Sequence, residues 1–185
     1  MGAKSSVFIA TSLDGFISRV DGSIDWLEQA NLVVPEGEDC GYKAFISTVD
    51  ALVMGRNTFE QVLTFDGWPY AKLPVVVLSH KQIAIPTVIK DTVMVSQESP
   101  IEIVTRLLAK GIQHIYVDGG RTIQSFFAAD LIDEITITVI PILLGTGRPL
   151  FGPLPHDIHL THIQSMSYEF GFVQHRYRVA RETNL

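Results

Sequence analysis

Residues 54–60, Met-Gly-Arg-Asn-Thr-Phe-Glu, combine a sharp turn with groups that suit an anion. An apolar strand ends on Gly55, which lets the backbone turn tightly and come close to a ligand. Arg56 adds a planar fork of donors that matches phosphate. Asn57 is predicted to cap the next helix together with Glu60, so that the first helical amides face outward. The segment predicts an anion site, and the alternative is a capped helix with a surface arginine.

The elements around this turn alternate between strands and helices. Apolar runs of strand length predict buried strands, those at 74–79 and 92–96 being central in the sheet, and amphipathic or capped segments predict helices. The predicted strands are 6–11, 51–54, 74–79, 92–96, 112–118 and 132–141, the helices are 38–47, 57–64, 99–110 and 122–129, and a terminal antiparallel hairpin covers 158–180. We therefore predict a three-layer α/β fold with a central, mostly parallel, twisted sheet of about eight strands and an antiparallel C-terminal edge.

In such a sheet, ligands bind beyond the carboxyl ends of the strands. Asp14, Gly55-Arg56 and Gly119-Gly120 are all predicted at such ends. Consecutive glycines permit a close approach to a pyrophosphate, although a simple tight turn would need them too. The segment 79–81, Ser-His-Lys, adds hydroxyl and cationic donors after another strand. Together these features outline a site for a dinucleotide with several phosphates.

Composition narrows the class of protein. The 185 residues fit one domain, 1–185, and the chain is 46% hydrophobic with a formal net charge of −6, which argues against non-specific nucleic-acid binding. No apolar run approaches the length of a membrane span, and the N-terminus does not resemble a signal peptide, so we expect a soluble, cytoplasmic protein. The single cysteine, Cys40, excludes an intrachain disulfide and a multi-thiolate zinc site.

Two motifs suggest other kinds of site, a dinucleotide-binding glycine turn and a metal site, but each lacks a feature that such a site needs. Gly145-Thr146-Gly147 lacks the third glycine of a dinucleotide-binding turn, because Arg148 and a proline follow it at once. His156, His159 and His162 are spaced by three in an extended segment, where neighbours of that spacing face opposite sides. We therefore expect no metal site.

Taken together, five ordered motifs resemble the dihydrofolate reductase-like superfamily, and within it the reductase domain of the riboflavin-biosynthesis deaminase-reductase. The resemblance spans about residues 6–179. The motifs are Ser12–Ile17, Met54–Phe59, Leu78-Ser79, Val117–Gly120 and Leu131–Glu134 followed by Pro141–Gly145. The deaminase half of that enzyme is missing, so the chain resembles a stand-alone reductase domain.

What the resemblance implies is NADPH binding and hydride transfer to a pyrimidine- or pteridine-type substrate. Ala10 and Ile17 would border the nicotinamide, and Arg56, Thr58 and Ser79 would hold the 2′-phosphate and the nearby pyrophosphate. The second glycine turn and its helix would wrap the pyrophosphate through Gly119, Gly120, Arg121, Thr122 and Ile123. The other cofactor-binding candidates beside these positions are Gly55, Asn57, Leu78 and His80. Members of the family often carry an arginine where this chain has His80, which leaves the choice between NADPH and NADH open.

Hydride transfer leaves a negative charge that a proton donor must quench, and a carboxyl whose pKa is raised by burial suits that task. Three aspartates are candidates. Asp14 matches the acid of the first motif, Asp118 precedes the glycine pair, and Asp39, on the helix before residue 54, has the spacing of the folate-binding carboxylate of dihydrofolate reductase. Each also has an ordinary interpretation, as a turn former, a strand-end cap and an exposed helix charge.

The leading hypothesis is an NADPH-dependent reductase of a ribosylaminopyrimidine or related heterocycle. Dihydrofolate reduction is the enzymatic alternative, but Trp26 and the insertion at 35–37 depart from the usual spacing before the acid. A non-catalytic module that keeps the NADP cleft is the alternative from another class. A homodimer is also expected, with the apolar segment 135–144 and residues 149–151 as a contact in addition to core.

Overall fold

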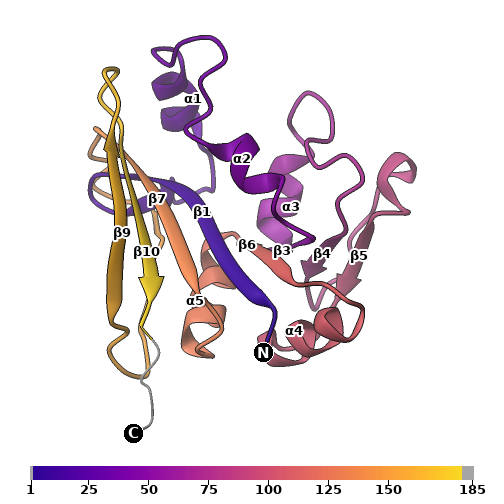
Figure 1. Ribbon diagram of the computed structural model, residues 1–185. Coiled ribbons are helices and arrows are strands. Elements are labelled where there is room, and N and C mark those ends of the chain that lie inside the picture. The colour runs from indigo at the N-terminus through magenta and orange to yellow at the C-terminus, as the bar shows by residue number, and fades with distance from the viewer. Residues whose placement is uncertain (1, 181–185) are drawn as a thin grey trace, which may run out of the picture.

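The computed structural model describes residues 2–180, and its central feature is an eight-stranded sheet with helices on both faces (Figure 1). The strands are β1 (Lys4–Ser12), β2 (Phe16–Ser18), β3 (Ala51–Gly55), β4 (Val75–Leu78), β5 (Val93–Ser96), β6 (His114–Asp118), β7 (Glu134–Ile140), β8 (Arg148–Pro149), β9 (Leu160–Ser167) and β10 (Val173–Val179). The helices are α1 (Asp25–Asn31), α2 (Tyr42–Ile46), α3 (Arg56–Val62), α4 (Pro100–Ala109) and α5 (Gly120–Ala128), with a 3₁₀ turn, η1, at Thr87–Ile89.

The large sheet has the order β5-β4-β3-β6-β1-β7-β10-β9. The six strands from β5 to β7 are parallel, and β10 and β9 add an antiparallel edge. The predicted fold class is therefore confirmed, including the C-terminal hairpin. Strands β3 and β4 are apolar along almost their whole length because both faces of the sheet are covered there.

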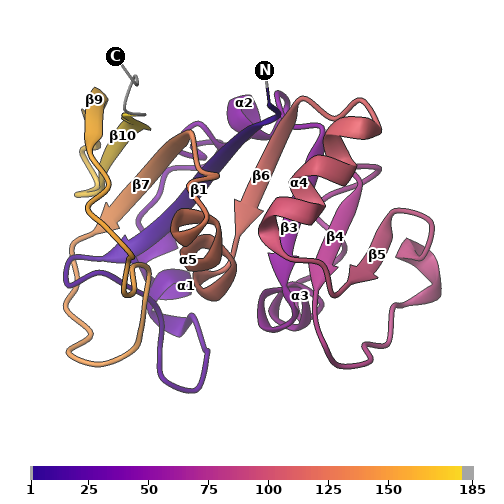
Figure 2. The same ribbon diagram turned by 90° about the horizontal axis from the view of Figure 1, so that it is seen from below.

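Each face of the sheet has its own helices. Side chains of α4 and α5, such as Ile103 and Phe126, pack with one set of strand residues, while those of α2 and α3, such as Phe45 and Phe59, pack on the opposite face. Figure 2 shows α4 and α5 lying together against one side of the strands, with β9 and β10 at one end of the sheet. Among the described helices, none is long and apolar enough to span a membrane.

Helix α4 begins as its sequence predicts. The Ser99 hydroxyl accepts a hydrogen bond from the Glu102 amide, and the Glu102 carboxylate accepts one from the Ser99 amide at 2.8 Å. Gly111, which has a positive φ of 87°, follows the end of the helix. These reciprocal caps satisfy amides that the helix itself leaves without partners.

Three local predictions were wrong. Strand β5 is an edge strand and not a central one, since its apolar residue Met94 is 40% exposed. Residues 16–18, for which no strand was predicted, form strand β2, which pairs with β8 at least 130 positions along the chain. The helix predicted over 38–47 is reduced to α2, so Asp39 lies before the helix and not on it.

Candidate functional site

Two helices begin next to each other at the carboxyl edge of the sheet. Strands β3 and β6 are neighbours, with Met54 paired to Asp118, and each runs directly into a helix. Gly55 is the N-cap of α3, and Gly119 is the N-cap of α5. The two glycine turns that the sequence analysis singled out are therefore brought together.

The glycines are packed by threonines of the opposite helix. A Cβ atom on Gly119 would collide with the hydroxyl of Thr58 in α3, and one on Gly55 would lie 2.9 Å from the hydroxyl of Thr122 in α5. Gly119 also has a φ of 89°, which a residue with a side chain rarely adopts. The turn at Gly119 thus needs glycine both for backbone conformation and for space, whereas Gly55, whose backbone is extended with a φ of −83°, needs it for space alone.

Gly120, the second glycine of the pair, lies against a residue from the N-terminal part of the chain. Its Cβ would lie 2.8 Å from the Cδ1 atom of Ile17 in β2. Strand β2 is held there by β8, and the Leu150 amide donates to the Gly15 carbonyl at 3.0 Å. Ile17 therefore lies against the second glycine of the pair, and its contact with a nicotinamide stays a prediction.

Arg56 and Asn57 differ from their predicted arrangement. The guanidinium of Arg56 donates to both carboxylate oxygens of Glu60, at 2.8 and 2.9 Å, one turn along α3. Asn57 is the second residue of the helix and makes no capping bond, because the chain enters the helix at Gly55. The predicted cap of Asn57 and Glu60 was wrong, and Glu60 instead forms an exposed ion pair with the arginine that was expected to meet phosphate.

The end of β4 lies beside α3. Leu78 pairs with Gly55, and the Ser79 amide donates to the Ser96 carbonyl at 2.9 Å. The Ser79 hydroxyl accepts from the Lys81 amide at 3.0 Å, which folds the exposed residue His80 into a short turn. These residues occupy the same sheet edge as the glycine turns.

The three residues after Gly120 have different surroundings. Arg121 is exposed at the first turn of α5, whereas Thr122 and Ile123 are buried. The Ile123 amide donates to the Gly119 carbonyl at 2.8 Å, and its side chain lies in the core. Ile123 therefore offers a ligand neither its side chain nor its amide, contrary to the prediction for that position.

A cavity of about 460 Å³ lies on the α1–α2 face of the sheet, over the second halves of β1 and β7. Its walls include Phe8, Ala10, Thr138 and Ile140 from the strands and Phe172 before β10. Ala10 thus lines this cavity, whereas Ile17 lies with the glycine turns on the other side of the strands. The two residues predicted to border a nicotinamide are on opposite sides of strand β1.

Asp39 lines the cavity together with Glu38 and Tyr42. The Asp39 carboxylate accepts from the amides of Gly41 and Lys43, at 3.0 and 2.9 Å, and so caps the start of α2. It is not buried, and its position at the rim suits contact with a substrate better than proton storage.

Asp118 ends β6 on the same sheet face as this cavity. Burial raises the pKa values of Tyr42, Tyr70 and Tyr116, and the charge of Asp118 raises them further. Desolvation raises the pKa of Asp118 to about 6, against the opposing effect of the Gly119 amide, which donates to its Oδ1 atom at 2.8 Å. Asp118 therefore has the property that a proton donor requires.

Asp14 has the opposite electrostatics. Its carboxylate accepts from the Ser12 hydroxyl at 2.6 Å and from the amides of Leu144 and Gly145 at 3.1 and 2.7 Å. These hydrogen bonds, that of Ser12 first, lower its pKa, and the side chain is exposed. Asp14 fastens the loop after β7 to the turn after β1, and the burial on which its prediction as proton donor depended is not found.

Sequence reasoning missed most walls of the cavity. Tyr42 was interpreted only as an apolar position of a helix, and Phe8 only as part of a buried strand. Their period marks burial but cannot distinguish a packed side chain from one that borders a cavity. Gln174, which ties β10 to this region by donating to the Cys40 carbonyl and the Thr138 hydroxyl at 2.9 Å, carried no signal.

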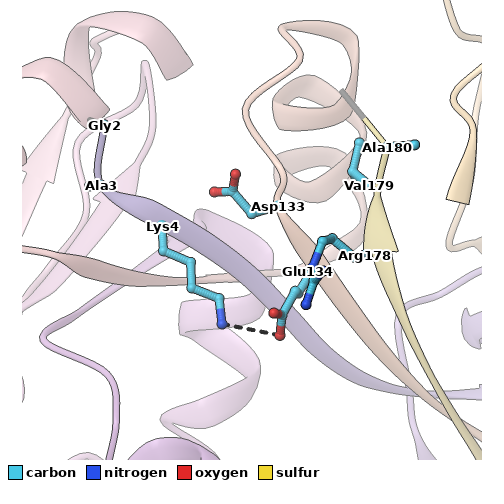
Figure 3. Close-up of a pocket in the computed structure, with 8 residues that line it drawn as sticks. All are labelled: Gly2, Ala3, Lys4, Asp133, Glu134, Arg178, Val179 and Ala180. Carbon is cyan, nitrogen blue, oxygen red and sulfur yellow. Dashed lines mark ion pairs between the residues drawn. The ribbon is translucent and has the colours of Figure 1, made fainter. Parts of the chain in front are cut away.

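A second hollow, of about 500 Å³, lies at the opposite edge of the sheet (Figure 3). It is lined by the first residues of β1 and β7 and the last of β10, where Lys4 and Glu134 form an ion pair at 3.1 Å. Arg176 donates to the same Glu134 carboxylate at 2.6 Å. This edge holds the amino ends of the parallel strands, where ligands of such sheets do not usually bind. Within residues 2–180 no three His, Cys, Asp or Glu side chains are grouped to hold a metal ion.

Comparison with known proteins assigns the chain to a protein family. The profile of the RibD C-terminal domain matches residues 4–173. The protein YwjB of Bacillus subtilis, itself uncharacterised, is 37% identical over 164 residues, which cover 86% of this chain and 89% of YwjB. YyaP of the same organism is 26% identical over 175 residues, or 90% of this chain and 89% of YyaP.

Solved structures agree with this assignment. A crystal structure from Shewanella sp. PV-4, named as a candidate riboflavin biosynthesis protein, is 44% identical with a TM-score of 0.88, covering 98% of this chain and 100% of that one. A deaminase/reductase from Thermotoga maritima has a TM-score of 0.71 at 14% identity, covering 97% of this chain and 57% of the larger protein, and so shows the shared fold. The chain belongs to the RibD C-terminal domain family.

Proposed function

We propose that this protein is an NADPH-dependent reductase that transfers hydride to a pyrimidine- or pteridine-type heterocycle. The observation that carries the proposal is the pair of interlocked glycine turns, in which Gly55 and Gly119 lie against threonines of each other's helix at the carboxyl edge of the sheet. Family membership supports it, since the Thermotoga maritima neighbour is named as a 5-amino-6-(5-phosphoribosylamino)uracil reductase.

The residues at the two turns fit a pyrophosphate dinucleotide. Gly119 and Gly120 present backbone without side chains at the start of the nine-residue helix α5, whose first amides lack partners within the helix. Arg121 and Arg56 stand at the first turns of the two helices and supply positive charge. The Ser79 hydroxyl lies at the same edge, after β4.

NADPH supplies the hydride when bound, and the protein's part is to orient the substrate and deliver a proton. The cavity over β1 and β7 holds the substrate ring between Phe8 and Phe172, against strand residues such as Ala10. Asp118, whose pKa is raised to about 6, donates the proton that follows the hydride. Tyr42 lines the cavity, and the charge of Asp118 raises its pKa, which supports a position of the proton donor near the substrate space.

A titration with NADPH and NADH, followed through tryptophan fluorescence, tests the cofactor. Trp26 is buried beside the cavity residues Leu27 and Ile140 and is a suitable reporter. We expect NADPH to bind, and Arg56→Ala to weaken that binding. Failure of both cofactors to bind would remove the reductase from consideration, while tight NADPH binding without oxidation by any heterocycle would favour a non-catalytic module.

A homodimer is part of the proposal, although the segment expected to form it is mostly core. Ile135 and Ile140 of β7 are buried inside the sheet, whereas Leu143 and Phe151 remain exposed. We propose that these two side chains contribute to the contact. Light scattering on the purified protein and on Leu143→Asp measures the mass directly, and a monomer in both would contradict the dimer.

A further inference from the structure

The cavity over β1 and β7 has an acidic rim. Glu38 and Asp39 both line it, and among the described residues that form its walls there is no lysine, arginine or histidine. A ligand seated there meets two carboxylates and no cationic side chain. The cavity therefore attracts positive or hydrogen-bond-donating groups and repels anions.

The two carboxylates are fixed in place. The Glu38 carboxylate accepts from the Cys40 amide at 2.6 Å, and Asp39 is held by the amides at the start of α2. Cys40, between them and the helix, has a left-handed φ of 52°, and its carbonyl accepts from Gln174 of β10 at 2.9 Å. The segment is thus tied to the sheet, and neither carboxylate can turn away from an anion without breaking these bonds.

Neighbouring cations do not compensate for this charge. Arg176, two residues from Gln174 on β10, is paired with Glu134 at 2.6 Å, and Arg19 before α1 is paired with Asp25 at 2.6 Å. Lys43 is the cation nearest in sequence to the rim, but its side chain is exposed and is not part of the cavity wall.

The remaining walls suit a flat ring with amino substituents. Phe8, Ala10, Ile140 and Phe172 supply apolar surface, and Asn31 and the carboxylates supply hydrogen-bond acceptors at the edge. The Thr138 hydroxyl accepts from Gln174 at 2.9 Å and keeps its own O–H to donate. The two carboxylates of the rim can only accept while ionised, so that end of the cavity favours N–H donors of a ligand.

We propose that the substrate is a small amino-substituted heterocycle that carries no phosphate or other anionic group. This inference rests on the proposed function and names the substrate class of its cavity. It distinguishes the chain from the deaminase/reductase of Thermotoga maritima, whose named substrate carries a phosphate.

Calorimetric titration of the protein saturated with the oxidised cofactor NADP⁺, which cannot reduce the ligand, with a matched pair of probes tests this. The probes are 5-amino-6-(5-phosphoribosylamino)uracil and its counterpart without the phosphate. We expect the phosphate-free probe to bind at least about tenfold more tightly, since like charges several ångströms apart in a partly buried site oppose each other by about that factor. In the variant Glu38→Gln/Asp39→Asn the preference should shrink toward equality.

Two further measurements keep the result decisive. If the double variant does not fold, added salt must reduce the preference in the unmodified protein, because screening weakens the repulsion. Equal or tighter binding of the phosphorylated probe overturns the inference, and loss of that binding in Lys43→Gln would show which cation was responsible. Repeating the titration without any cofactor separates this inference from the proposed reductase function. The preference for the phosphate-free probe belongs to the cavity, so it should persist even if the protein binds no cofactor.

Discussion

The hydroxyl of Thr58 occupies the space beside Gly119 that a side chain there would need. The relationship is reciprocal, since Thr122 of α5 lies in the same way against Gly55 before α3. Because the two strands are paired from Ala51 to Met54, the two helix starts cannot move apart without disturbing the sheet. The close fit of these four residues keeps the two turns in one position relative to each other.

Gly119→Ala is therefore expected to destabilise the protein more than Gly111→Ala. Both glycines have positive φ, at 89° and 87°, but a Cβ on Gly111 would meet nothing within 4 Å. The control should lose about 1–2 kcal/mol of unfolding free energy from backbone strain, and the collision at Gly119 should add about 1–3 kcal/mol. Urea denaturation measures both. The additional Thr58→Ala change should recover part of the loss, and no recovery would show that the hydroxyl is not the obstacle.

Arg56→Ala should weaken NADPH binding by about tenfold to a hundredfold and NADH binding much less. The reason is that a charge-assisted hydrogen bond to phosphate contributes about 1.5–3 kcal/mol, and only NADPH carries the 2′-phosphate. Fluorescence titration with both cofactors measures the difference.

Glu60→Gln is the matched control for that prediction. Glu60 now holds the Arg56 guanidinium through two hydrogen bonds, so its neutral analogue should leave NADPH binding unchanged or tighter. The exposed pair adds only about 0.3–0.5 kcal/mol to stability, and the variant should fold normally. Equal weakening by both substitutions would mean that the ion pair positions α3 and that Arg56 does not contact phosphate.

The sequence predicted the sheet well where burial on both faces makes a strand continuously apolar, as in 51–54 and 75–78. It predicted the edge position of β5 wrongly because Val93 and Met94 are both apolar although only Val93 is buried. Strand β2 could not be found, since three residues become a strand only through the distant partner at 148–149. Pairing of this kind leaves no local pattern.

The site was predictable to the extent that a glycine marks a close backbone turn after a buried strand. Gly119 is required there by its positive φ and Gly55 by the lack of space, and the structure brings the two turns together. The charge environment of the three aspartates was not predictable, because it depends on contacts from remote segments. Asp14 accepts hydrogen bonds from the amides of residues 144 and 145, while desolvation by the surrounding fold raises the pKa of Asp118.

Asp14→Asn should destabilise the protein at neutral pH. Its hydrogen bonds lower the pKa of the carboxyl in the folded state, so the stabilisation is present above the unfolded pKa and is lost as pH falls through the folded one. Thermal unfolding at pH 7 and at pH 2.5 checks this, with a smaller difference between the variant and the original expected in acid. An unchanged melting temperature at pH 7 would show that the loop of residues 144–145 does not depend on this anchor.

Asp118→Asn should have the opposite effect on stability. The folded pKa of Asp118 is raised from 3.8 to about 6, so the folded protein binds the proton more tightly than the unfolded chain does. Below about pH 3, under the unfolded pKa of 3.8, the carboxyl is protonated in both states and imposes no penalty. As pH rises from about 4 to about 6, the unfolded state ionises first, and the unfolding free energy falls by about 3 kcal/mol, at 1.36 kcal/mol for each unit of pKa shift.

The asparagine keeps the shape of the side chain and an oxygen for the Gly119 amide, but it carries no charge. At pH 8 the variant should therefore be more stable than the original protein by about 2–3 kcal/mol, and at pH 4 the two should be nearly equal. Its turnover should be lost at every pH, whereas turnover of the original should fall about tenfold per unit above pH 6 as the proton donor ionises. A stabilised variant with full activity would separate the two roles, leaving Asp118 as a buried carboxyl that the reaction does not use.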